Sequence, residues 1–205
     1  MTDVPTGFAA ATRRITSDDV DANSQTALRE LSQKGYEIHT GLTVELVDRI
    51  KAMSQEPAIR EYCPKDSTDR FADRQVAEQW LSKGRAMFLL LKDGELIGYG
   101  WTGPATSDNV PGGQTTFALR IGQIGHGQGL AAPFSWLTIS ASHVMFGLQA
   151  IWLETWASNG AAVHIYHKLG FVNVTERPSS RPTALGDHVD DVRIYMKLPD
   201  NYLAN

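Results

Sequence analysis

Three glycines stand at alternate positions in GHGQGLAAPF, residues 125–134, directly before a run that is predicted to be helical. The first turn of a helix leaves several main-chain N–H groups without partners, and these donors, together with the helix dipole, attract anions. Glycine lets the main chain approach a phosphate because it has no Cβ. Gly125, Gly127 and Gly129 therefore predict phosphate binding by main-chain amides, while a simple tight turn stays open as the other interpretation.

Two familiar phosphate motifs do not explain these glycines. The chain contains no G-x-x-x-x-G-K-[ST], so it has no P-loop. Gly127, Gly129 and Ala132 fit the looser dinucleotide spelling G-x-G-x-x-A, but they follow a predicted hairpin midway along the chain. A Rossmann site is therefore disfavoured, because its motif opens a βαβ unit.

The elements that would position this loop follow from hydrophobic periodicity and turn signals. Helices are expected over residues 23–35, 42–53, 70–83, 130–147 and 160–169. Strands are expected over residues 36–41, 86–92, 95–102, 115–122, 148–156, 171–176 and 189–198. Loops are expected over residues 54–69, 104–113 and 177–187. This order predicts a mixed α/β fold with a largely antiparallel sheet and one or two parallel crossovers.

The length of 205 residues and a hydrophobic content of 42% suit one domain with a single core. We expect residues 1–35 to form an N-terminal arm with one helix, its first 20 residues loosely held. Residues 36–199 would be the domain and residues 200–205 a C-terminal tail.

Composition narrows the class of function. A net charge of −4 argues against a nucleic-acid binder, which would normally show a basic face. No apolar run reaches the ~20 residues of a bilayer span, and the N-terminus lacks the order of a secretory signal. Cys63 is the single cysteine, so no internal disulfide forms, and nothing in EYCPKD suggests an activated thiol. We expect a cytoplasmic protein without nucleic-acid or membrane partners.

The two most distinctive stretches resemble one known family. HGQGLA, residues 126–131, resembles the acyl-CoA pyrophosphate loop [QR]-x-x-G-x-[GA] of the GNAT superfamily of N-acetyltransferases, although His126 stands where Gln or Arg is usual. NGAAVHIYHKLGF, residues 159–171, resembles the second signature of that family, an Asn after a strand and then Y-x-x-x-G-F. The likeness in element order runs from Tyr36 to Leu198. It implies a mixed, mostly antiparallel sheet of six to seven strands, splayed between the fourth and fifth strands and flanked by helices.

The resemblance implies that acetyl-CoA binds along this splay, with no metal. The pantetheine arm would pair with main-chain groups of the strand TTFALRIG, residues 115–122, and the diphosphate would rest on the amides of the glycine loop. His126 would donate a ring N–H to a phosphate or lie exposed, and Asn159 would bind the cofactor arm, cap the next helix, or both. The residues implied in cofactor binding are Leu119, Ile121, Gln123, His126, Gly127, Gln128, Gly129, Leu130, Ala131, Asn159 and Tyr166.

Two catalytic residues are implied in the same way. Tyr166 resembles the general acid that returns a proton to the CoA thiolate, and a core tyrosine with its hydroxyl at the rim is the other interpretation. An amide near Ile121 would stabilise the oxyanion. The strand that carries the cofactor lacks the glutamate of many relatives, and Glu154 lies on the next strand, on one face with Trp152 and Trp156. Glu154 is either a general base with a raised pKa or a carboxylate paired across the sheet.

Three charged residues are candidates for binding the acceptor. Arg120 would bind a substrate carboxylate if it faced the pocket, and would pair on the sheet surface if it faced away. Asp190 and Asp191 flank the last strand, where the family often lines its acceptor pocket. They would attract a cationic amine or belong to a solvated acidic turn.

The implied function is transfer of an acetyl group from acetyl-CoA to a primary amine of a small molecule or peptide, by direct attack in a ternary complex. The alternative is a non-catalytic acyl-CoA-binding module that acts as a sensor or assembly partner. Transfer of a longer acyl chain is a third interpretation. A homodimer is expected by analogy with relatives.

Overall fold

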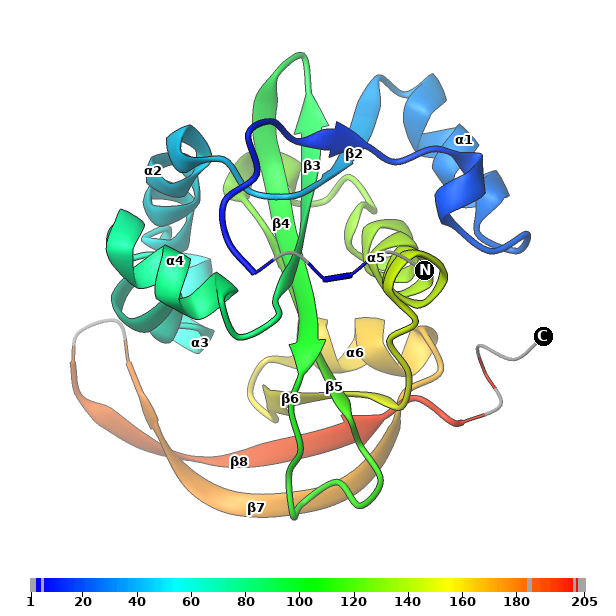
Figure 1. Ribbon diagram of the computed structural model, residues 1–205. Helices are drawn as coiled ribbons and strands as arrows, with labels where there is room; N and C mark the ends of the chain where they lie inside the picture. The colour runs from blue at the N-terminus through cyan, green and yellow to red at the C-terminus, as the bar shows by residue number, and fades with distance from the viewer. Residues whose placement is uncertain (1–2, 5, 184–185, 201, 203–205) are drawn as a thin grey trace.

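The computed structural model describes residues 3–4, 6–183, 186–200 and 202. Within these residues one eight-stranded sheet runs in the order β1-β2-β3-β4-β5-β6-β8-β7 (Figure 1). Its strands are β1 (Arg13–Arg14), β2 (Tyr36–Thr40), β3 (Ala86–Lys92), β4 (Glu95–Pro104), β5 (Thr115–Ile121), β6 (Ile151–Trp156), β7 (Val172–Pro182) and β8 (His188–Lys197). Neighbours are antiparallel except β5 and β6. The expected mixed, mostly antiparallel sheet is confirmed, with one more strand than the expected maximum.

Helices cover both faces of this sheet (Figure 1). The helices are α1 (Gln25–Gln33), α2 (Val44–Ser54), α3 (Pro57–Tyr62), α4 (Arg74–Leu81), α5 (Ala131–Phe146) and α6 (Gly160–Lys168), with short turns η1 (Ser17–Asp19), η2 (Asp66–Arg70) and η3 (Gln123–Gly125). Helices α1, α5 and α6 pack on one face, and α2, α3 and α4 pack on the other. The central strands are therefore apolar on both sides.

Strand β3 shows why its sequence, AMFLLLK, does not alternate between apolar and polar residues. Phe88 and Leu90 point into the core beneath α1 and α5, whereas Met87 and Leu89 point into the core beneath α2 and α4. Side chains alternate between faces along a strand, so a strand covered on both faces must be apolar throughout.

Two stretches expected as loops contain regular structure. Residues 54–69 hold α3 and most of the π-helical turn η2. Pro57 is compatible with α3 because it occupies the first turn, where a proline removes no helical hydrogen bond. Residues 177–182 continue β7 as an edge strand, where prolines are tolerated. The β7–β8 hairpin is therefore longer than the sequence suggests.

The N-terminal arm is held more firmly than expected. Its helix is present as α1, and Arg13–Arg14 pair with β2. Ile15 and Val20 are 2% and 4% exposed and share a core with α5, so the expectation of a loose first segment is wrong for these residues. Of the expected tail, residues 201 and 203–205 lie outside the described residues.

Candidate active site

Strands β5 and β6 diverge soon after they begin. They pair only at Thr115 with Ile151 and at Thr116 with Trp152. On its other side β5 pairs with β4 along its whole length, and the amide of Gly122 continues this pairing by donating to the carbonyl of Ile97 at 2.9 Å. Main-chain groups of alternate residues point to the same neighbouring strand, so those of Leu119 and Ile121 face the gap left by β6.

Side chains donate to the carbonyls of both Leu119 and Ile121 on this edge of β5. Arg120 donates its Nη1 to the carbonyl of Leu119 at 2.8 Å. His126 donates its Nε2 to the carbonyl of Ile121 at 3.0 Å, which requires the proton on Nε2. The amide of Gln123 donates to a carboxylate oxygen of Glu56 at 2.6 Å. His126 therefore closes the loop onto β5, and a cofactor arm would meet the amides of Leu119 and Ile121.

The glycine loop needs its glycines for two different reasons. Gly127 and Gly129 have φ of +73° and +70°, in the left-handed region that favours glycine, and a Cβ at either position would meet open space. A Cβ on Gly125 would lie only 2.7 Å from Cγ2 of Ile121 and 2.9 Å from Cγ2 of Ile97. Gly125 therefore permits close packing, and the other two permit the turn.

The start of α5 has free donors. No side chain caps this 16-residue helix, and its N-cap residue is Leu130. The amides of Gly127, Gly129 and Leu130 donate to no main-chain carbonyl within the part of the chain that the structure describes. The side chain of Gln128 is turned inward, where its Nε2 donates to the carbonyl of Ile124 at 2.6 Å and its Oε1 accepts from the hydroxyl of Tyr36. The loop thus presents main-chain donors, as an anion site requires.

Helix α6 carries the second predicted motif and packs it against β5, where Tyr166 contacts Phe117. Asn159 caps α6, since its Oδ1 accepts from the amide of Ala162 at 3.2 Å, so the cap interpretation is confirmed. Tyr166 is 8% exposed and packs edge-on against Phe117 and Phe171. Burial raises the pKa of Tyr166 to about 12, although the charge of Arg120 opposes the rise. The hydroxyl therefore carries its proton at neutral pH.

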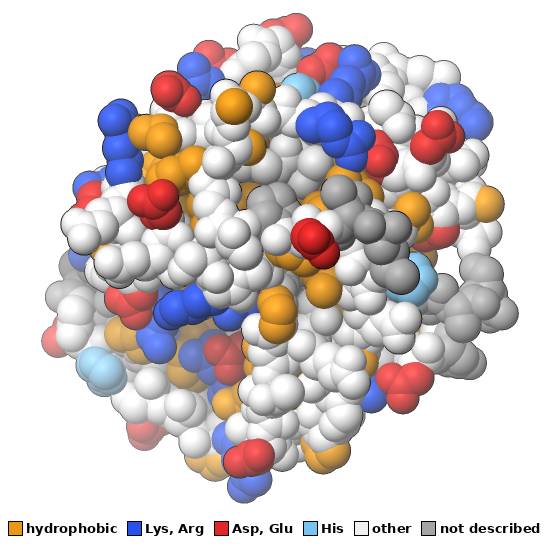
Figure 2. Space-filling view, in the orientation of Figure 1, with side chains coloured by type: hydrophobic (Ala, Val, Ile, Leu, Met, Phe, Trp, Pro, Cys, Tyr) orange, Lys and Arg blue, Asp and Glu red, His pale blue; other side chains and the backbone are white. Residues whose placement is uncertain are grey.

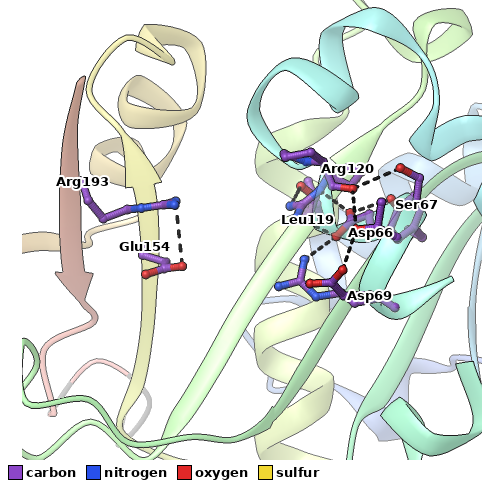
Figure 3. Close-up of polar contacts among 11 residues, drawn as sticks. Asp66, Ser67, Asp69, Leu119, Arg120, Glu154 and Arg193 are labelled. Atoms are coloured by element: carbon purple, nitrogen blue, oxygen red, sulfur yellow. Dashed lines mark hydrogen bonds and ion pairs between the residues drawn. The ribbon is translucent and has the colours of Figure 1, made fainter. Parts of the chain in front are cut away.

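Arg120 lies within a buried charge cluster, in neither of the two surroundings that the sequence suggested. Its Nε donates to Asp66 at 2.8 Å (Figure 3), and Arg70 also pairs with Asp66. The hydroxyl of Tyr99 donates to the same carboxylate at 2.7 Å. Burial alone would raise the pKa of Asp66, whose side chain is 0% exposed, but the two arginines outweigh it and hold that pKa below its usual value. Asp66 was missed because it lay in an expected loop; an arginine within an apolar strand was the signal that a carboxylate must face it.

Glu154 faces solvent across the gap from this cluster (Figure 3). Its side chain is 45% exposed, and its Oε1 lies 3.8 Å from Nη1 of Arg193 on β8. The guanidinium of Arg193 lies 3.4 Å from the ring centroid of Trp156. This geometry supports the cross-strand interpretation of Glu154, because its carboxylate lies exposed beside the guanidinium of a neighbouring strand.

The two aspartates expected near the acceptor differ in role. Asp190 is exposed on β8. Asp191 accepts from Nε of Arg181 at 3.0 Å and from the main-chain and side-chain donors of Ser158. Arg181 also bonds Glu61 at 2.6 Å, so Asp191 helps to fasten the β7–β8 hairpin to α3.

Helices α3 and α4 and the β7–β8 hairpin enclose a hollow on one face, where basic and acidic side chains gather (Figure 2). Cys63, just after α3, is a free thiol whose pKa is raised by burial, so it is not activated as a nucleophile. Within the described residues, no group of three His, Cys, Asp or Glu side chains could hold a metal ion, and no helix has the length and hydropathy to cross a bilayer.

Comparisons with known proteins agree with this geometry. A family model described as "Acetyltransferase (GNAT) domain" matches residues 41–172. A mycothiol acetyltransferase of Streptomyces avermitilis is 36% identical over 105 residues, which are 51% of this chain and 32% of that protein. The chain thus matches about a third of the length of this curated relative.

Solved structures share the fold at low identity. Spermidine N-acetyltransferase from Vibrio cholerae, in complex with CoA and spermine, has a TM-score of 0.65 at 18% identity and covers 83% of this chain and 99% of its own. Ribosomal-protein-S5-alanine acetyltransferase from Vibrio fischeri has a TM-score of 0.62 at 16% identity, covering 81% and 94%.

Proposed function

The chain belongs to the GNAT acetyltransferase family, and from this premise we propose that it transfers the acetyl group of acetyl-CoA to a primary amine. Acetyl-CoA is the co-substrate that family membership assigns. The divergence of β5 from β6 beside an uncapped α5 carries the proposal, because it offers two kinds of free main-chain donor in one groove. The amides of Leu119 and Ile121 would pair with the pantetheine arm, and those of Gly127, Gly129, Leu130 and Ala131 would hold the diphosphate. The amide of Gln128 donates to the carbonyl of Gly125 at 3.4 Å and would have to leave it to join them.

The reaction is direct attack of a neutral amine on the thioester carbonyl. A main-chain amide near Ile121 that the pantetheine arm leaves free would stabilise the oxyanion that forms, and Tyr166 would return a proton to the departing thiolate. A tyrosine whose pKa is about 12 is protonated at neutral pH and can act as this acid. The amine must lose its own proton before it attacks, since an ammonium has no lone pair.

The acceptor would enter through the hollow enclosed by α3, α4 and the β7–β8 hairpin. The curated relative is named a mycothiol acetyltransferase. The two structural neighbours are named acetyltransferases of spermidine and of a ribosomal protein. A polyamine acceptor fits poorly, because Arg70, Arg120 and Arg193 all face this side of the sheet. A small amine without several positive charges is the class that these charges favour.

The test is release of CoA thiol from acetyl-CoA with a panel of amines, with CoA binding measured separately by calorimetry. Tyr166→Phe should lower kcat by about 100-fold or more and leave CoA affinity nearly unchanged, since it removes only the proton donor. Tyr202→Phe, which alters an exposed tyrosine, is the matched control. Tight CoA binding without turnover on any amine would support the non-catalytic module instead, and no CoA binding would refute both.

We also propose a cytoplasmic location, supported by the free thiol of Cys63 and by dependence on acetyl-CoA. A homodimer is proposed by family analogy, and light scattering of the purified chain tests it.

A further inference from the structure

Two arginines, Arg70 and Arg85, contact the indole of Trp101, but only Arg70 is paired with a carboxylate. Asp66 pairs with Arg70 and Arg120, whereas Arg85 lies within ion-pair distance of no carboxylate in the described parts of the chain. Burial lowers the pKa of Arg85, and the charge of Arg70 lowers it further, so the two guanidiniums repel each other. The cluster therefore has positive charge in excess, in a half-buried place where water screens it weakly.

The side chain of Arg85 lies in a recess formed by Trp80, Trp101 and Gly103. Its guanidinium carbon lies 5.4 Å from the ring centroid of Trp101 and 5.9 Å from that of Trp80, and the same carbon of Arg70 lies 5.2 Å from Trp101. A Cβ on Gly103 would come within 2.6 Å of Cδ of Arg85, so the glycine makes room for the side chain. Two cations thus contact one indole from two different elements.

Two N–H donors in the recess lack an acceptor within the described part of the chain. Nε of Arg85 and Nε1 of Trp101 are buried and lack a hydrogen-bond partner among the described residues, and Trp101 is 6% exposed. A buried donor without a partner destabilises a folded protein, and such groups are rare. Here both orphans are donors, and both lie beside uncompensated positive charge. One anion would satisfy the donors and balance the charge together.

We infer that Arg70, Arg85 and Trp101 bind a carboxylate group of the amine acceptor. The identification of the ligand as the amine acceptor rests on the proposed function, but the anion site itself does not depend on acetyl transfer. A carboxylate suits the recess because its two oxygens match a guanidinium fork and an indole N–H. The acceptor class is then an amino acid or another amine with a carboxylate.

Binding of a carboxylate can be measured without turnover. Succinate should change the tryptophan fluorescence of the protein and raise its melting temperature, and succinamide at the same concentration and ionic strength should do neither. The effect should disappear in Arg85→Met, which keeps an unbranched side chain between the two indoles. Arg60→Met, which removes an exposed arginine of α3, should respond like the native chain.

Two further variants separate binding from structural roles. Trp101→Phe removes the orphan N–H and keeps a ring, but the smaller ring leaves a space in the core, so the variant should fold with a lower melting temperature. Measured below that temperature, it should bind succinate about tenfold more weakly than the native chain. Gly103→Ala should weaken succinate binding by displacing Arg85. Succinate without effect on the native chain, or an equal effect in Arg85→Met, would overturn the inference.

Turnover then connects the site to the acceptor. Glycine, β-alanine and 4-aminobutanoate place the amine at increasing distance from the carboxylate, and each has a matching amide. At least one acid should exceed its amide in kcat/KM by about tenfold, and Arg85→Met should abolish that preference. Amides that match their acids throughout, in a protein that binds CoA and acetylates amines, would overturn the inference and leave the proposed function standing. Succinate binding in a protein that does not bind CoA would leave the anion site standing and overturn the proposed function.

Discussion

Replacing Asp66 with asparagine tests the buried charge cluster beneath the proposed acceptor face. The carboxylate is 0% exposed and compensates Arg70 and Arg120, while it accepts from the hydroxyl of Tyr99 at 2.7 Å. Asparagine has nearly the same volume, so the substitution removes charge and creates no cavity. It leaves two partly buried guanidiniums without a counter-ion.

The expected loss is large for a single substitution. Breaking a buried ion pair by removing one partner costs about 3–5 kcal/mol, because the remaining charge stays desolvated. Arg70 and Arg120 are 23% and 12% exposed and gain some compensation from water, so the lower end, about 3 kcal/mol, applies. In a chain of this size that loss lowers Tm by roughly 6–12 °C.

Urea unfolding followed by tryptophan fluorescence measures this loss directly. Asp69→Asn, an exposed carboxylate in the same turn, is the control and should change stability by less than about 0.5 kcal/mol. The pKa of Asp66 is lowered in the folded state, so its contribution is present above the unfolded value of 3.8 and is lost as pH falls through the folded pKa. The gap between native and variant should therefore narrow in acid. A loss below about 1 kcal/mol at neutral pH would refute the reasoning.

Other perturbations test the proton donor, the glycine loop and the carboxylate on β6. Because the pKa of Tyr166 is raised from 10.0 to about 12, the native chain should lose about 3 kcal/mol more stability between pH 10 and pH 12 than Tyr166→Phe, in which Tyr99 and Tyr195 still titrate; parallel unfolding titrations of the two proteins would contradict this. Gly125→Ala should lower stability by about 2 kcal/mol through overpacking, against about 1 kcal/mol for Gly127→Ala, which only strains φ; the reverse order of melting temperatures would count against the loop geometry. Glu154→Gln should lower kcat less than about threefold in the thiol-release assay, since an exposed carboxylate 3.8 Å from Arg193 is poorly suited to be a base, and a loss of 100-fold would restore that role.

Local sequence patterns were enough to place the loop and the frame around it. Gly127 and Gly129 predicted a special turn before a helix because left-handed φ is cheap only for glycine, and both have positive φ. Asp93-Gly94 predicted the β3–β4 hairpin, and Asn159 predicted the start of α6, since turns and caps depend on a few adjacent residues. The mixed sheet followed from the order of these elements.

The β7–β8 hairpin and the N-terminal segment could not be predicted in the same way. Strand β7 runs through Pro178 and on to Pro182 because an edge strand tolerates residues that a central strand rejects, and edge position is a property of the whole sheet. The N-terminal segment was expected to be loose, yet Ile15 and Val20 find a core that α5 supplies. Partners distant in sequence decided both outcomes.

The sequence alone indicated the family and the glycine loop, and it singled out Tyr166 as the candidate proton donor, because each depends on residue types at short spacing. Only the tertiary structure decided that Asp66 pairs with both Arg120 and Arg70, that Glu154 lies exposed beside Arg193, and that Arg85 has no counter-ion among the described residues. Whether a charge is paired, buried or free is set by residues many positions away, which come together only when the chain folds.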